Sequence, residues 1–168
     1  MWLKIEASML SAPETLIFIA FSFGAAIFHA LLGVERSVWP IAYSNSKTVN
    51  EGDLRSVFVV LQGLSSYLPP SYGIVSLVGL CGLIWQCIIL NWTWQADTVL
   101  VFWFLGQVYI LTFGKIVQAV KALRQTKKDD AIMVVRRVVR QLIRQHFNGL
   151  LHATGIVVLE IVLITVSR

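Results

Sequence analysis

The chain has 168 residues, of which 57% are hydrophobic and 14% are charged, and its mean hydropathy is +0.73. A soluble domain of this length cannot bury so many apolar side chains, so the composition excludes an ordinary soluble protein. The net charge of +5 does not imply a nucleic-acid partner, because the basic residues lie beside apolar stretches, where they orient a membrane protein and meet anionic lipid headgroups.

Four stretches are long enough to cross a hydrocarbon core, which takes about 20 apolar residues. They cover residues 16–34, 72–90, 98–120 and 147–166. Pro13 and Glu14 suit the first turn of the first helix, since proline supplies a helical φ and glutamate complements the helix dipole. We therefore predict an all-α, integral membrane four-helix bundle with cytoplasmic helix extensions, in a single domain over residues 1–168.

Two further segments are predicted to be structured outside the spans. Residues 57–68 are apolar but too few to cross a bilayer before Pro69 and Pro70, so this segment is expected to lie in the interface or to enter partway. Residues 129–147 have helical periodicity, with Asp129 or Asp130 as the N-cap. The fourth helix is thus predicted to extend well into the cytoplasm.

The basic residues predict the orientation of the chain. Those around the loop between the third and fourth helices are Lys121, Arg124, Lys127, Lys128, Arg136, Arg137, Arg140 and Arg144. The positive-inside rule places this loop in the cytoplasm, against anionic headgroups, and both termini on the opposite side. Trp92, Trp94 and Trp103 are predicted to form an aromatic belt at that opposite interface.

Small residues at helical spacing favour close packing of the four helices. They are Ala26 and Ala30, Gly79 and Gly82, and Gly149 and Ala153. Such pairs are common in membrane helices, so they support the architecture and carry no chemistry.

Polar residues inside the spans carry most of the functional information, because each is costly to bury without a partner or a cavity. His29 and His152 lie at a similar depth from the cytoplasmic side, Asn148 is one turn from His152, and Lys115 can reach the same level. We predict a polar pocket for a lipophilic ligand lined by these four residues.

Two other polar residues have separate predictions. Glu160 lies about 80° around the helix from His152, so it needs a partner of its own and is expected to be protonated or bonded to an amide. His146 lies among arginines and is predicted to be solvated.

Three interpretations of His29 and His152 remain open. Each can hydrogen-bond a neighbouring helix, both can contact a quinone or another aromatic ligand, or the two can be axial ligands of a b-type haem in the bundle core. A di-iron carboxylate site is excluded, because only Glu35 and Glu160 lie near the spans. No metal site is predicted, and Cys81 and Cys87 are too far apart for a dithiol motif.

The segments "FSFGAAIFHALLGVERSVWP" and "FNGLLHATG" resemble the anthrone-oxygenase-like family of small four-helix membrane proteins. The "ERSVWP" exit of the first helix and the Phe147–Asn148 pair that opens the last helix are similar to that family's pattern. Where the family carries an arginine one turn further on, this chain has Thr154. The resemblance implies an oxygenase for a lipophilic aromatic substrate, with His29 and His152 as base and polarising donor.

The fragments "FHALLGVER" and "HATG" are also similar to haem- and quinone-binding anchor subunits of succinate dehydrogenase-type complexes. That resemblance implies a haem or quinone contact for His29, with Arg36 against a propionate or the quinone rim. Because the chain is small and its set of catalytic groups is incomplete, we favour a binding or accessory subunit of a membrane complex, with protein partners in the membrane, over an enzyme.

Overall fold

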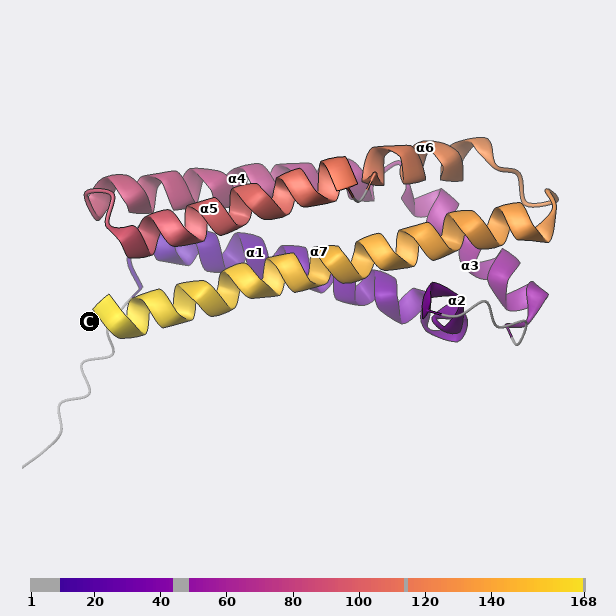
Figure 1. The fold of residues 1–168 in the computed structure, drawn as a ribbon, viewed down its shortest axis with the longest axis horizontal. Helices are drawn as coiled ribbons and strands as arrows, with labels where there is room; N and C mark the ends of the chain where they lie inside the picture. The colour runs from indigo at the N-terminus through magenta and orange to yellow at the C-terminus, as the bar shows by residue number, and fades with distance from the viewer. Residues whose placement is uncertain (1–9, 44–48, 114, 168) are drawn as a thin grey trace, which may run out of the picture.

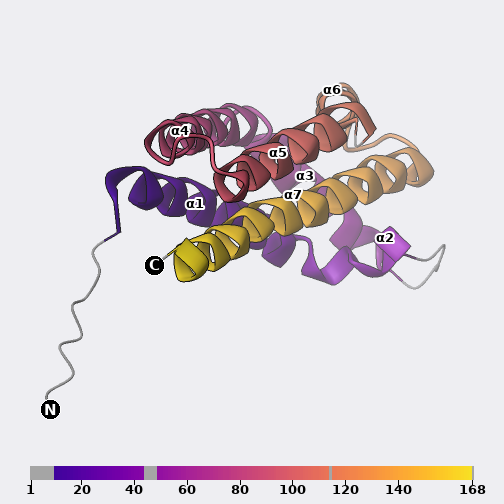
Figure 2. The same cartoon turned by 60° about the vertical axis from the view of Figure 1, so that its left-hand side comes forward.

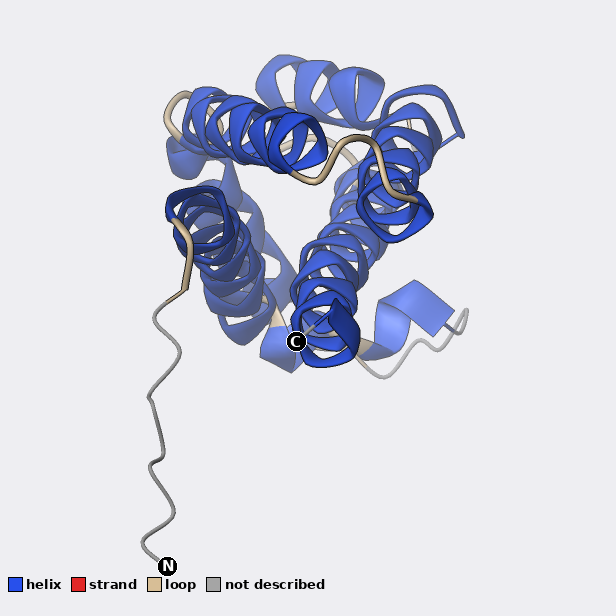
Figure 3. Cartoon of the chain, turned by 90° about the vertical axis from the view of Figure 1, so that its left-hand side faces the viewer, coloured by secondary structure: helices blue, strands red, loops and turns tan. Residues whose placement is uncertain are grey.

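The computed structural model describes residues 10–43, 49–113 and 115–167, and within these ranges the chain is helical or loop (Figure 3). The elements are α1 (Ala12–Val34), η1 (Arg36–Val38), α2 (Pro40–Tyr43), α3 (Glu51–Leu64), α4 (Leu68–Ile89), α5 (Trp94–Val108), η2 (Tyr109–Phe113), α6 (Ile116–Gln125) and α7 (Ile132–Ser167). Four helical stretches are long and apolar enough to span a membrane, and these are α1, α4, α5 to α6, and α7. The predicted all-α bundle with four candidate spans is confirmed.

The first span begins where the sequence predicts a helix start. Ser11 and Glu14 form a capping box, in which the Ser11 N–H donates to Glu14 Oε2 at 2.6 Å, and Pro13 lies in the first turn. Helix α1 packs along both α7 and α4, so it holds the bundle together. The α4–α5 turn and the C-terminal end of α7 lie at one end, while α2, α3 and α6 lie at the other (Figure 1).

The outer surface of the bundle is apolar along the spans. Its exposed side chains include Ile19, Phe23, Ile74, Leu77, Val101, Phe104, Val158 and Ile161. A patch of this size is unfavourable in water and favourable against lipid tails, so the outer surface agrees with a multi-pass membrane protein. Trp92 and Trp94 are exposed at the α4–α5 turn, as a belt residue should be.

The third span is not the continuous helix that was predicted over residues 98–120. The α-helix α5 ends at Val108, the π-helix η2 follows, and Lys115 adopts a left-handed conformation (φ 54°, ψ 36°) before α6 begins. A lysine in this conformation stops an α-helix, because its backbone cannot continue the right-handed hydrogen-bond ladder. The third span therefore consists of α5 with η2 and of α6, and Lys115 precedes α6.

The segment before Pro69 forms α3, which begins at Glu51 with the Asn50 side chain accepting the Gly52 N–H at 2.8 Å. It packs against α6 and α7 at the end of the bundle. The fourth helix extends far beyond its span, as predicted, and runs the length of the molecule (Figure 2). Its start was predicted wrongly, because the Asp130 carboxylate accepts the Lys127 N–H at 2.9 Å in the preceding turn and α7 begins at Ile132.

Small residues make close helix contacts at two of the three predicted pairs. Gly79 lies under the Phe21 ring, Gly82 under Ile17, and Gly149 under the Phe28 ring. Ala26 and Ala30 are exposed, so the prediction that this pair forms a helix contact was wrong. The buried face of α1 carries Phe21, Phe28 and Leu32, and the two alanines lie on the other face.

Candidate functional site

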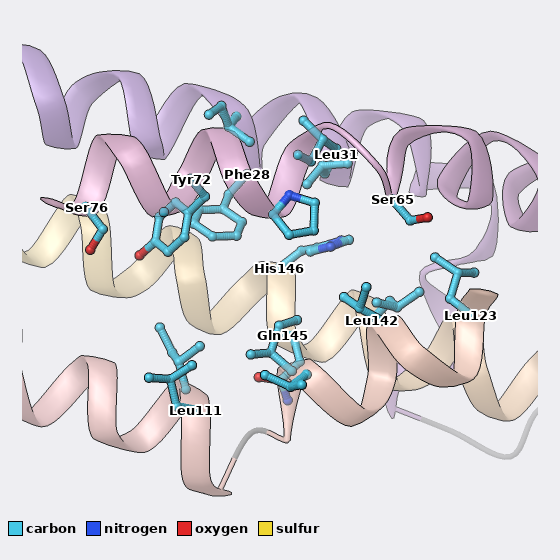
Figure 4. A pocket seen from close by; sticks show the side chains of 18 of the residues that line it. Phe28, Leu31, Ser65, Tyr72, Ser76, Leu111, Leu123, Leu142, Gln145 and His146 are labelled. Carbon is cyan, nitrogen blue, oxygen red and sulfur yellow. The ribbon is translucent and has the colours of Figure 1, made fainter. Parts of the chain in front are cut away.

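A cavity of about 860 Å³ lies in the half of the bundle that contains α3 and α6. Its wall is built by α1, α3, α4, α5, η2, α6 and α7, and Figure 4 shows side chains from α1, α4, η2, α6 and α7 around it. The lining is largely apolar, with Phe28, Leu31, Leu80, Ile110 and Leu142 among its members. Both its size and its apolar lining are those of a site for a small organic ligand.

A buried acid–imidazole pair lies at the cavity wall. His146 Nδ1 and Glu35 Oε1 are 2.7 Å apart, the carboxylate is fully buried, and the imidazole is nearly so. Glu35 follows the last turn of α1, where its N–H donates to the Leu31 carbonyl at 3.0 Å, and η1 begins at the next residue. The backbone of the α1–η1 junction thus fixes the carboxylate, and α7 brings the imidazole to it.

This pair corrects the prediction that His146 is solvated. The neighbouring Arg144 does turn outward, where its Nε donates to the Ala42 carbonyl at 2.9 Å. His146 itself faces inward, because α7 continues as a regular helix and α1 packs against this part of it. The Phe28 ring lies 6.3 Å from the imidazole, centroid to centroid, and helps to seal it.

Further polar groups lie deeper along the cavity. The Gln107 amide donates to the Tyr72 hydroxyl at 3.4 Å, which joins α5 to α4. Ser76 Oγ, Trp103 Nε1 and Gln145 Oε1 are buried without a hydrogen-bond partner in the described part of the chain. Trp103 is one of the residues that line the cavity. The prediction that it belongs to the aromatic belt was wrong, because its side chain faces the inside of the bundle. Unpaired polar atoms around an apolar cavity are groups that a ligand could satisfy.

The end of the cavity next to α3 is basic. Lys121 and Arg124 of α6 line it, and the Arg124 guanidinium donates to the carbonyl and the hydroxyl of Ser65. Gln62 of α3 donates to the Leu123 and Thr126 carbonyls at 3.2 and 3.0 Å. These bonds hold α6 on α3 and fix the Arg124 guanidinium.

The four predicted ligand-binding residues lie elsewhere. His29 is exposed on α1, Lys115 is exposed at the break in the third span, and Asn148 is half-buried on α7. His152 is buried against α5, with its ring over Gly106 and 5.6 Å from the Phe102 ring, centroid to centroid. None of the four lines the cavity described above, so the structure does not bring them together there.

The two histidines proposed as haem ligands differ in their surroundings. Both ring nitrogens of His152 are buried without a hydrogen-bond partner in the described part of the chain, whereas His29 is exposed. A haem or quinone role for this pair stays a prediction. In the described ranges, no three His, Cys, Asp or Glu side chains converge on a possible metal position.

A second buried acid lies outside the cavity. The Gln86 amide of α4 donates to Glu160 Oε1 of α7 at 2.5 Å, and both side chains are buried. The prediction that Glu160 finds an amide partner inside the bundle is confirmed.

The missed site had a signal in the sequence. Buried residues recur on α7 at intervals of three and four, at Val135, Val139, Leu142, His146, Gly149, Ala153, Ile156, Glu160 and Leu163. This spacing is the seam of a packed helix, and His146 and Glu160 both lie on it. The continuous seam, rather than the charge of neighbouring residues, predicts which polar side chains face inward. No protein-family model, curated protein or solved structure matches the chain.

Proposed function

We propose that this chain is a membrane protein that binds a lipophilic ligand between its helices, as a binding or accessory subunit of a membrane complex. The observation that supports this proposal best is the 860 Å³ cavity, which combines an apolar lining with the Glu35–His146 pair. An apolar cavity with a few fixed polar groups is the usual form of a small-molecule site. The structure supports His146, rather than His29 and His152, as the polar group of this site.

The surroundings of the cavity favour entry from the bilayer. Leu77 of α4, Leu111 of η2 and Val117 of α6 line it and are also exposed on the outer surface. The helix α4 packs on α1 and α5 but scarcely touches α6. A lipophilic molecule can therefore pass between α4 and α6 without crossing water.

Ligand binding is tested by filling the cavity. Gly73 lines it, and a Cβ added there meets nothing within 4 Å, whereas the adjacent Ile74 is exposed and does not line the cavity. We expect native mass spectrometry to detect one bound methyl hexadecanoate on the wild-type protein and on Ile74→Phe. Binding to Gly73→Phe should be weaker by roughly tenfold or more, because the new ring occupies the site. Absence of the bound ester from the wild-type protein would contradict the proposed function.

The proposal includes an orientation. From the basic residues of α6, the α6–α7 turn and the first half of α7 we infer that this end lies in the cytoplasm, against anionic headgroups, and that both termini lie on the other side. In a background lacking Cys81 and Cys87, we expect Lys127→Cys to react with an impermeant thiol reagent only from the cytoplasm. Thr93→Cys, in the α4–α5 turn, should react only from the opposite side, and the reverse pattern would refute the orientation.

The enzymatic alternative stays a prediction. The anthrone-oxygenase-like and anchor-subunit resemblances both invoke His29, which is exposed and does not line the cavity. Co-purification in a mild detergent and an absorption spectrum separate the possibilities: a Soret band indicates haem, and a stable co-purifying protein indicates an accessory subunit.

A further inference from the structure

One end of the cavity carries two cationic side chains, and the described lining of the other end carries none. Figure 4 shows Ser65, Leu123 and Leu142 toward one end and Tyr72, Ser76 and Leu111 toward the other. Lys121 and Arg124 belong to the first end, since Arg124 bonds Ser65, while Leu77, Leu80 and Trp103 line the second. Along α4 the lining runs from Leu68 to Leu80, which is about 18 Å at 1.5 Å per residue. This shape suits a ligand with one polar head and one long apolar tail.

One nitrogen of His146 is free to meet that head. Nδ1 is engaged by Glu35, while the described residues form no hydrogen bond with Nε2. Because the ring lines the cavity, Nε2 is the nitrogen available to a ligand. A carboxylate on Nδ1 orients the imidazole, as second-sphere carboxylates do for histidines in other sites, so Nε2 is the position at which the ring can accept a proton.

The charged and titratable groups around the cavity favour an anion. Glu35 of α1 lies behind the imidazole, Tyr72 of α4 contributes a hydroxyl, and Lys121 and Arg124 of α6 contribute two cations. In the described lining, α3, α5 and η2 add no ionisable side chain. Glu35 Oε2 also lacks a hydrogen-bond partner, so a positive charge on the imidazole compensates a buried carboxylate that has only one bond.

We propose that the ligand is a lipophilic carboxylic acid with a long chain, held by His146 Nε2 and the α6 cations with its chain along α4. This inference rests on the proposed function and names the ligand class of the same site. The neutral acid enters from the bilayer, its O–H bond breaks, and the proton moves to His146 Nε2. The products are a ligand carboxylate and an imidazolium that is hydrogen-bonded on both nitrogens, by Glu35 and by the ligand.

Glu35 acts in this scheme as a positioning residue. Glu35→Gln keeps a hydrogen bond to the ring but removes the negative charge that stabilises the imidazolium. It should therefore leave the imidazole in place and raise the pH at which the bound acid loses its proton. A purely structural role for Glu35 would not move that pH.

The test uses hexadecanoic acid labelled with ¹³C at the carboxyl, because its chemical shift reports ionisation. In lipid nanodiscs, we expect the acid bound to the wild-type protein to be ionised at a pH where acid in empty nanodiscs is still protonated. His146→Asn and Glu35→Gln should lose this difference and weaken acid binding roughly ten- to hundredfold, the range for a hydrogen bond to a charged group. Binding of methyl hexadecanoate should be unchanged in both variants.

His152→Asn and Glu160→Gln are the matched controls, since both residues are buried on α7 and neither lines the cavity. Both controls should bind and ionise the acid as the wild-type protein does. If either cavity variant fails to fold, the exposed Lys121 allows Lys121→Gln, which should weaken acid binding and spare the ester. Equal binding of acid and ester, or unchanged ionisation in the variants, overturns the carboxylic-acid inference but leaves the proposed function standing. Failure of acid and ester alike to bind the wild-type protein overturns the proposed function as well.

Discussion

Gln86→Leu is expected to destabilise the protein by about 2–4 kcal/mol, because it leaves the Glu160 carboxyl buried without its amide partner. The two side chains join α4 to α7 at 2.5 Å, and Glu160 has no exposed surface. Their neighbours on the same faces, Leu83 and Ile156, are apolar and fully buried, so neither can replace the amide. Reversible unfolding in bicelles measures the loss directly.

Replacing the acid instead of the amide should lower the free energy of unfolding by less. Glu160→Leu leaves a neutral amide without a partner, which we expect to cost about 1–2 kcal/mol, because a neutral group loses less on desolvation than an acid. The double variant Gln86→Leu/Glu160→Leu removes both groups and should recover most of the stability, as replacement of buried polar pairs by apolar residues often does.

Comparison of the two single variants with the double variant separates a structural role of the pair from a functional one. Recovery in the double variant shows that the groups matter chiefly to each other. If Glu160→Leu alone were as stable as the wild-type protein and assembled normally, a functional role for Glu160 would become unsupported. A double variant no more stable than Gln86→Leu would contradict the pairing.

Hydropathy was sufficient to predict the four spans, because the bilayer requires long, continuous apolar stretches whatever the packing between them. It could not predict the break at Lys115. Apolar residues continue on both sides of that lysine, so hydropathy does not mark the left-handed backbone there. The bonds of Gln62 and Arg124 that hold α6 on α3 join residues 61 and 59 positions apart, which no local pattern links.

The candidate site was only partly predictable for a related reason. His146 was judged from its neighbours in the sequence, which are arginine-rich, but burial on a helix depends on the residues three and four positions away. Leu142 and Gly149 are those neighbours, and both are buried. Its partner Glu35 lies 111 residues earlier, just after the last turn of α1, so no local pattern links the two.

The same argument explains the outcome for Glu160. It lies in an apolar run with no nearby charge, and there the cost of burial alone requires a partner. That requirement was enough to predict an amide bond, although not that Gln86 supplies it.

Gly149→Ala tests the contact on which the cavity depends, and we expect it to destabilise the protein by about 2–3 kcal/mol, as overpacking of a filled site does. A Cβ at this position would lie 2.3–2.6 Å from atoms of the Phe28 ring. The ring cannot easily move away, because Tyr72 packs edge-on against it at 4.9 Å and His146 lies at 6.3 Å, centroid to centroid. The helices α1 and α7 must therefore separate.

The control is Gly33→Ala on α1, where a Cβ meets nothing within 4 Å. That variant should be neutral or stabilise the protein by up to about 1 kcal/mol, because alanine favours the helix more than glycine does.

Adding Phe28→Leu to Gly149→Ala removes the ring atoms that clash and should restore part of the lost stability. Because Phe28 also lines the cavity and packs near His146, Gly149→Ala alone should weaken binding of hexadecanoic acid as well. A variant that unfolds like the Gly33→Ala control and binds the acid normally would show that the α1–α7 contact at Gly149 is loose, and that neither the bundle nor the cavity depends on it.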